Sequence, residues 1–297
     1  MNWIANSDTI IFGPEFNAEL DIELISAYAK LIFSNYMMND NLFESYENNN
    51  LNEQEFSENK FNQDVSNLPP SLTHLIFGCN FNQDVSALPH SLTYLIFGYY
   101  FNQDVKSLPQ GITYLSFGCE FNRDVSNLPH SLTCLFFGHN FNQDISSLPQ
   151  GITYLTFGNR FNQDISKLPS SITHLTLGQE FNQRCDIPSN VKYLNLQCNN
   201  LHVINLLPNS IIELKLNECF NLRMDNLPTS IKKLVIDKLS RYNNDLNCLH
   251  DFIEELHLNR CYSKRILHIP INLKKIVCHI EYPYKDDFVV SNVQTYR

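Results

Sequence analysis

FNQDVSNLPPSLTHLIFGCN (residues 61–80) is the first of six nearly identical twenty-residue units, and FNQDISKLPSSITHLTLGQE (161–180) is the sixth. The register continues in weaker form through five strand-like cores spaced 19 to 22 residues apart: VKYLNLQCNNL, IIELKLNECFNL, IKKLVID, IEELHLNRC and LKKIVCH. Self-similarity at a fixed period of this length is typical of repeat proteins, in which each repeat is one structural unit. The repeat therefore decides the fold.

Each unit contains an apolar pattern that predicts one short β-strand. Leu75 and Phe77 alternate with other residues and point inward from a strand near 73–77. Pro69 has no N–H to give to a sheet, so it lies in the turn before that strand. The leucine-rich-repeat template L-x-x-L-x-L-x-x-N-x-L is matched most clearly by Val191, Leu194, Leu196, Asn199 and Leu201.

A single unit cannot fold by itself, because ordering its backbone costs more free energy than its few inward side chains return. Stacking covers each inward side chain on both sides. Twenty residues leave little room for a helix on the return arm, which should be extended or 3₁₀. We therefore predict a mainly β, leucine-rich-repeat-like right-handed solenoid with a parallel sheet on its concave face.

The chain divides into three predicted regions. Residues 1–60 hold degenerate N-terminal repeats or a cap with an acidic polar insertion, residues 61–184 hold the six regular repeats, and residues 185–297 hold divergent repeats and a C-terminal cap. SDTIIFGPEFN, which starts at Ser7, repeats the strand and the F-G-x-x-F-N pattern, so the array begins there.

The rest of the N-terminal region allows two interpretations. ELDIELISAYAKLIFSNY is either a second degenerate unit, with Tyr28, Leu31 and Phe33 on its strand, or an amphipathic helix capped by Asp21. The stretch 39–60 is rich in Asn and Glu, and we expect it to interrupt the solenoid.

Charge and composition exclude several classes of partner. The net charge is -10, and residues 1–60 carry 11 acids against 2 bases, whereas residues 185–297 carry 12 acids against 14 bases. An acidic chain lacks the basic footprint that nucleic acids and anionic membranes require. No signal peptide or apolar stretch of membrane-spanning length is found. We expect an intracellular, cytoplasmic, monomeric protein with neither nucleic acid nor membrane as its partner.

The nine cysteines predict neither a metal site nor a disulfide framework, because no C-x-x-C pair or zinc-like Cys/His spacing occurs. Cys79 and Cys119 share a repeat position, but two rungs of sheet would hold them about 9–10 Å apart, too far for a bridge. No phosphate loop, nucleophile elbow or HExxH motif is found. We expect no enzyme activity, no metal and no cofactor.

The outward strand positions are the candidate contact surface for a partner. One column holds His74, Tyr94, Tyr114, Cys134, Tyr154, His174 and Tyr193, and the next includes Ile76, Ile96 and Phe136. A row of glycines follows them, and the pair of rows could form a shallow aromatic groove of the kind that protein partners use. Alternatively, the aromatic residues only stabilise the sheet by cross-strand stacking and the glycines serve a tight turn.

Three other columns have structural interpretations. Glu213, Lys233, Glu255 and Lys275 alternate in sign along the first column, which favours cross-strand pairing over a charged contact patch. The column that starts at Asp64 could bind a cation, but an aspartate beside a turn more often accepts backbone N–H bonds. The column that starts at Asn62 predicts an internal ladder of amides that joins neighbouring coils.

The motif FNQD followed by L-P-x-S-L-T-x-L-x-F-G resembles the FNIP repeat, a leucine-rich-like unit known from social amoebae and expanded in giant viruses that infect amoebae. Gln-Asp follows Phe-Asn here, where the family name implies Ile-Pro. Members often carry an F-box, which implies substrate recognition for a ubiquitin ligase, but we find no F-box in this sequence. From the aromatic column beside the glycine row, we expect a non-enzymatic protein-interaction scaffold that binds a partner through its concave face. The alternatives are a structural or assembly component and a ubiquitin-ligase adaptor without a recognisable F-box.

Overall fold

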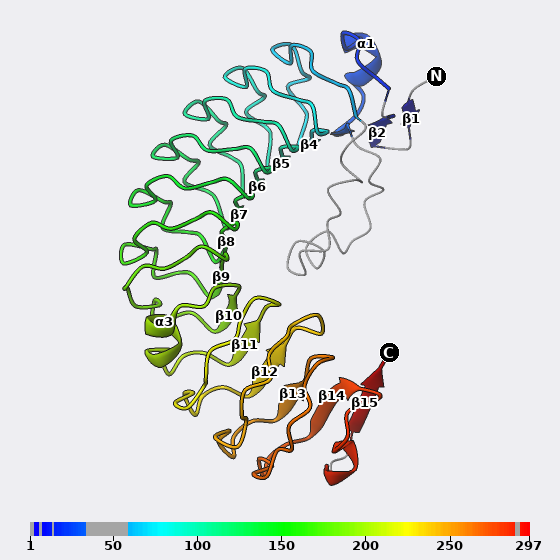
Figure 1. Ribbon diagram of the computed structural model, residues 1–297. Helices are drawn as coiled ribbons and strands as arrows, with labels where there is room; N and C mark the ends of the chain where they lie inside the picture. Colours follow the sequence, from blue (N-terminus) through cyan, green and yellow to red (C-terminus); the bar gives the residue numbers. More distant parts are fainter. Residues whose placement is uncertain (1–2, 6–7, 14, 34–58, 289–291) are drawn as a thin grey trace. The chain divides into compact units, whose positions relative to one another are not determined.

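The computed structural model describes residues 3–5, 8–13, 15–33, 59–288 and 292–297. The chain forms two compact units, residues 1–152 and 153–297. The predicted interruption at 39–60 lies almost wholly outside the described residues. Each unit is a stretch of β-solenoid in which every coil contributes one short strand, and the strands follow the inner side of the unit's own curve (Figure 1).

The strands of the first unit follow one another in chain order. The first pair is antiparallel, and each later pair in this unit is parallel. The elements are β1 (Trp3–Ala5), β2 (Thr9–Phe12), α1 (Ile22–Ile25), β3 (Lys30–Ile32), β4 (His74–Ile76), β5 (Tyr94–Ile96), β6 (Tyr114–Ser116) and β7 (Cys134–Phe136).

The second unit continues the pattern with strands of three to five residues, and all its strand pairs are parallel. Its elements are β8 (Tyr154–Thr156), β9 (His174–Leu177), β10 (Tyr193–Leu196), α3 (Leu201–Asn205), β11 (Glu213–Leu216), β12 (Lys233–Ile236), β13 (Glu255–His257), β14 (Lys275–His279), the 3₁₀ turn η2 (Lys285–Asp287) and β15 (Asn292–Tyr296).

The pairing register aligns equivalent repeat positions on neighbouring strands. His74 pairs with Tyr94 and Tyr94 pairs with Tyr114, each step being one repeat of the sequence. Leu75 and Leu95 pair in the same way. This confirms that side chains recurring every twenty residues form straight rows, and it confirms the predicted solenoid and its parallel sheet.

Phenylalanine rows fill the interior behind the sheet. Phe77 is fully buried and stacks on Phe81 with ring centroids 3.6 Å apart, and the ring of Phe97 on the next coil lies 5.7 Å from that of Phe77. Leu75 is equally buried between its counterparts. Each ring is therefore covered by neighbours above and below, which is the mutual burial that one coil cannot provide alone.

The polar columns hold the return arms in place as predicted. Asn82 donates its backbone N–H to the side-chain oxygen of Asn62 at 2.9 Å, so the asparagines form a ladder between coils. The Asp64 carboxylate accepts the N–H and the hydroxyl of Ser66 at 3.0 and 2.6 Å. The return arms are otherwise turns and extended backbone. They contain 3₁₀-type bonds: Leu92 donates its N–H at 3.2 Å to the carbonyl oxygen of Pro89, the counterpart of Pro69 in the next repeat.

Both features considered for the N-terminal region are present. Asp21 accepts the N–H groups of Glu23 and Leu24 at 3.1 and 3.2 Å and caps α1, which is only one turn long. The chain then enters β3, where Leu31 pairs with Leu75. The segment is a degenerate repeat, because its second half forms the strand β3 of the sheet and the helix ends at Ile25.

Two elements of the second unit differ from the sequence expectation. Leu201, which matches the last leucine of the repeat template, is 56% exposed at the start of α3, where Asn200 caps the helix by accepting the N–H groups of His202 and Val203. The strand β15 has no leucine-rich signature, yet it pairs with β14 over five residues. Among the described residues, no helix has the length and apolar content needed to cross a bilayer.

The glycine row is explained by close approach between coils. A Cβ atom placed on Gly118 would lie 2.0 Å from the carbonyl oxygen of Gly98, and one placed on Gly98 would lie as close to Gly78 O. Real Cβ atoms do not approach a carbonyl oxygen so closely. The glycines are therefore required where one backbone lies against the next, and they face the neighbouring coil instead of opening a groove.

We expect Gly118→Ala to lower the free energy of unfolding by about 1–3 kcal/mol, because the coils must separate to admit the methyl group. Gly111→Ser is the matched control, since a Cβ there meets carbonyl oxygens only at 3.4 Å and the equivalent Ser131 hydroxyl donates to Ile112 O at 2.6 Å. We expect it to stay within about 0.5 kcal/mol of the wild type. Urea unfolding measures both; equal losses would contradict the close-approach explanation.

Candidate partner-binding face

The candidate site is the outward face of the sheet, which strand alternation defines. In β4, Leu75 points into the core whereas His74 and Ile76 point outward. The next strands repeat this arrangement through the pairing register. The outward face therefore carries the two predicted columns as continuous rows within each unit.

The first unit carries a row of stacked rings on this face. The centroids of His74 and Tyr94 are 5.3 Å apart, and those of Tyr94 and Tyr114 are 4.3 Å apart with an interplanar angle of 15°. All three side chains are half-buried. Burial lowers the pKa of His74, with Lys30 adding to the effect, and Thr73 Oγ1 lies 2.8 Å from its Nδ1. Cys134 continues the row as a half-buried thiol.

The second unit carries a row whose rings lie closer together and whose last ring is exposed. The rings of Tyr154 and His174 stack at 3.8 Å and those of His174 and Tyr193 at 4.2 Å, with interplanar angles of 20° and 12°. Tyr193 is 40% exposed. Burial lowers the pKa of His174 to about 4, so its imidazole is neutral at pH 7 and stacks as an uncharged ring.

The neighbouring column in the first unit differs from the expected exposed surface. Ile76, Ile96 and Phe136 are at most 5% exposed. Ile76 and Ile96 form a cluster with Ile32, and Tyr94 and Tyr114 pack against it. Their large side chains reach the adjacent rungs and cover one another, so they support the ring row instead of offering free surface. In the second unit the same column holds smaller, half-buried Thr156 and Thr176.

Beyond β10 the same face becomes charged, and its charges pair across strands. Lys233 Nζ lies 3.2 Å from Glu213 Oε1, and Lys275 Nζ lies 2.9 Å from Glu255 Oε1. His257 Nε2 also lies 2.5 Å from Glu255. This confirms the predicted cross-strand pairing.

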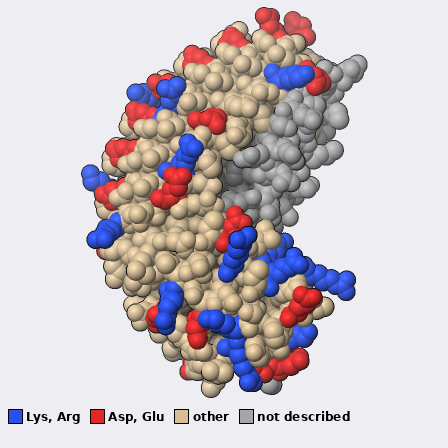
Figure 2. Space-filling view, viewed as in Figure 1, with Lys and Arg blue, Asp and Glu red and all other residues tan. Residues whose placement is uncertain are grey.

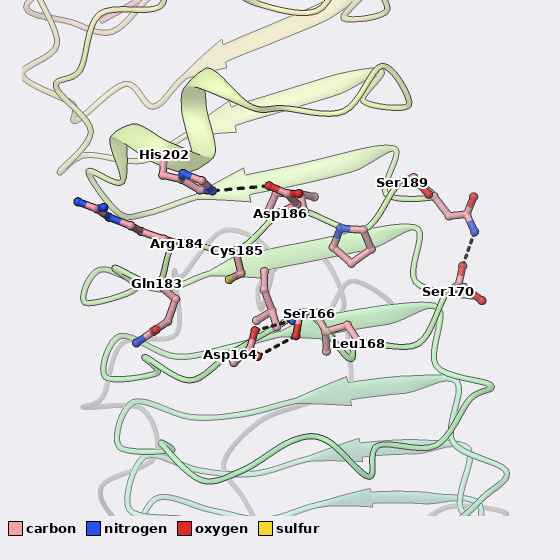
Figure 3. A pocket seen from close by; sticks show the side chains of 14 residues that line it. Asp164, Ser166, Leu168, Ser170, Gln183, Arg184, Cys185, Asp186, Ser189 and His202 are labelled. Atoms are coloured by element: carbon pink, nitrogen blue, oxygen red, sulfur yellow. Dashed lines mark hydrogen bonds and ion pairs between the residues drawn. The ribbon is translucent and has the colours of Figure 1, made fainter.

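One surface hollow was missed by the sequence analysis. The coil at 181–188 reaches its proline one residue sooner than the preceding coil and lacks the Asp-x-Ser turn. An open hollow of about 930 Å³ lies there, lined among others by Ser166, Cys185, Asp186 and His202 (Figure 3). His202, from α3, places its Nε2 atom 3.6 Å from the Asp186 carboxylate. The shortened spacing was the signal that could have located it.

The hollow lacks an activated nucleophile. Burial raises the pKa of the Cys185 thiol, and the nearby Asp164 and Asp186 carboxylates raise it further, so the thiolate that would attack a substrate is disfavoured. Across the described ranges, no three His, Cys, Asp or Glu side chains gather closely enough to hold a metal ion. We therefore attribute the hollow to the shortened coil and assign it no chemical role.

The one-strand coils, their parallel sheet and their leucine-rich spacing define a leucine-rich-repeat-like solenoid protein. The FNIP repeat model matches residues 61–100, 101–140, 141–180, 161–199 and 181–219, which together cover more than half of the chain. The chain belongs to the FNIP repeat family, as the sequence resemblance indicated.

Two solved structures that are similar to this chain are CroV588 and the functional domain of InlJ. CroV588, a giant-virus protein described as a novel circular LRR structure, is 28% identical with a TM-score of 0.58, covering 96% of this chain and 51% of its own. The functional domain of InlJ from Listeria monocytogenes is 15% identical with a TM-score of 0.49, covering 87% and 64%. This chain thus spans about half the length of CroV588. No curated protein matches it in sequence.

The stacked imidazole predicts an acid-sensitive step in stability. Because His174 binds a proton more weakly in the folded chain (pKa about 4) than in the unfolded chain (6.5), stability should fall as the pH drops from 6.5 towards 4. His174→Tyr places the residue of the neighbouring rungs there and should remove part of that loss. Urea midpoints at both ends of this pH window measure the effect. His139→Tyr, at an exposed loop position, is the control; a profile for His174→Tyr identical to the wild type would contradict the prediction.

Proposed function

We propose that the protein is a non-enzymatic interaction scaffold that binds a protein partner on the outward face of its sheet. The row of His74, Tyr94, Tyr114, Cys134, Tyr154, His174 and Tyr193 is the proposed contact surface. The observation that carries the proposal is the stacked row of the second unit, which ends in the 40% exposed Tyr193. Rigid aromatic side chains give large contact area at low entropic cost and are enriched at protein interfaces.

Folding alone does not account for aromatic residues in this row. The coils of β11 to β14 keep the same register with Glu213, Lys233, Glu255 and Lys275 in that column. The sheet thus tolerates charged residues where the earlier strands carry rings, and the phenylalanine rows stabilise the coils from the inner side. The choice of aromatic residues in the earlier coils fits recognition of a partner.

The other features of the molecule agree with a scaffold. Most sequence columns repeat from coil to coil, whereas catalysis requires one asymmetric constellation of groups. In the hollow, burial raises the pKa of the Cys185 thiol, which disfavours the nucleophilic thiolate. We further propose that the protein acts as a monomer in the cytoplasm, which in a virus would be the host cytoplasm. Sedimentation that shows concentration-dependent oligomers would favour the assembly role instead.

The experiment compares partner capture by matched variants. We expect Tyr154→Ser/Tyr193→Ser to lose the proteins that the wild type captures from native cells, while far-UV circular dichroism stays unchanged. Tyr100→Ser is the control, because Tyr100 is 53% exposed on a loop beyond β5 and outside the row. Mass spectrometry of the captured proteins is the measurement. Equal capture by the double variant and the control would contradict the proposed face.

A further inference from the structure

A second surface of the C-terminal unit carries unpaired positive charge. It lies on the loops that follow β12 and β13 and beside the end of β15, and we call Lys238, Arg241, Arg260, Lys264 and Arg297 the basic rim. All five side chains are exposed. Figure 2 shows Lys and Arg side chains over the lower, C-terminal part of the molecule, with Asp and Glu side chains among them.

Hydrogen bonds between neighbouring coils hold the members of the basic rim near one another. Arg260 N–H donates to Lys238 O at 3.0 Å. Ser263 N–H donates to Asn243 Oδ1 at 3.1 Å, which ties the coil of Lys264 to that of Arg241. The Tyr296 hydroxyl donates to Leu258 O at 2.8 Å and brings the end of β15, with Arg297, to the same edge.

The cations of the basic rim differ from the lysines of the sheet face. Lys233 and Lys275 are paired with glutamates, whereas within the described part of the chain no carboxylate oxygen lies within 4.0 Å of a rim cation. Acids of the described chain lie on or beside the coils of the rim, and one of them, Glu218, takes the repeat position of Lys238 on the preceding coil. Asp237 accepts the N–H of Leu239 at 2.9 Å within its own turn, and Glu281 lies 3.9 Å from His279. The rim therefore keeps a local positive excess in a protein whose net charge is -10.

Exposed apolar side chains lie among these cations. Leu239 follows Lys238 directly and is 65% exposed, and Ile280, at the same position one coil beyond Arg260, is 40% exposed. The exposed Leu239 side chain offers an apolar contact beside the cations, and a purely ionic ligand would not use that contact. The surface combines dispersed positive charge with small apolar contacts.

We propose that the basic rim binds an acidic, leucine-containing peptide segment of a partner protein. Carboxylates would pair with the rim cations while an apolar side chain covers Leu239, and the opposite charges would also speed the encounter. Binding of an extended nucleic acid needs a basic surface broader than these few coils, whereas a short acidic segment matches their extent. This surface is separate from the aromatic row and does not depend on the function proposed for that row.

The test measures binding of a fluorescent peptide to the whole chain. The peptide has about twelve residues and consists of Glu-Asp-Leu repeats. Anisotropy should show binding that weakens as NaCl rises from about 50 mM to about 300 mM, since exposed charges are screened. We expect Lys238→Glu/Arg241→Glu/Arg260→Glu to bind at least about tenfold more weakly. Arg160→Glu/Lys167→Glu/Arg184→Glu makes the same charge change away from the rim and should bind within about twofold of the wild type, apart from long-range repulsion.

Further arms separate the explanations. Leu239→Ser should weaken binding of the Glu-Asp-Leu peptide but not of a Glu-Asp-Ser peptide, which isolates the apolar contact. Thermal unfolding of each variant confirms that it remains folded. Equal binding by both triple variants, no binding at low salt, or tighter rim-dependent binding of a single-stranded oligonucleotide of equal charge would overturn the proposal. The Tyr154→Ser/Tyr193→Ser variant should bind the peptide normally, so a failure here is distinguishable from failure of the aromatic face.

Discussion

The fold depends on contact between one coil and the next. The carbonyl oxygen of Gly98 lies where any side chain on Gly118 would be placed, and each inner phenylalanine lies between its counterparts on adjacent coils. Neither contact exists within a single coil. A twenty-residue unit therefore gains its stability from its neighbours, and any change in coil length must be absorbed locally, because the strands before and after it stay in register.

Coil contact also explains which features could be predicted from the sequence. Rows of identical residues show directly which side chains meet, so the strand positions, the Asn62 ladder, the Asp64 turn and the pairing of Lys233 with Glu213 all followed from spacing. The repeat pattern does not predict elements that depart from it, such as α3 and β15. The start of α3 at Leu201 depends on the cap that Asn200 provides, and the pairing of β15 depends only on an available sheet edge.

The candidate face was predicted with less success, because the direction in which a side chain leaves the strand does not determine how exposed that side chain is. Alternation correctly placed Ile76 and Ile96 on the outward side of the sheet, but it could not show that they cover each other and pack against Tyr94. Burial on that side depends on side-chain size in adjacent rungs. Where the column holds Thr156 and Thr176, these side chains stay half-buried, and the exposed ring of the second unit is Tyr193 at the end of its row.

The same constraint limits where recognition can evolve. Columns that contact the next coil are constrained by stacking, and those of Phe77 and Gly98 keep phenylalanine and glycine through most of the regular repeats. The outward strand positions and the loops after the strands vary between coils, and these are where aromatic residues give way to paired charges and where the basic rim occurs. A partner that contacts these two surfaces meets residues that differ from coil to coil, so these surfaces can distinguish this solenoid from another of the same repeat.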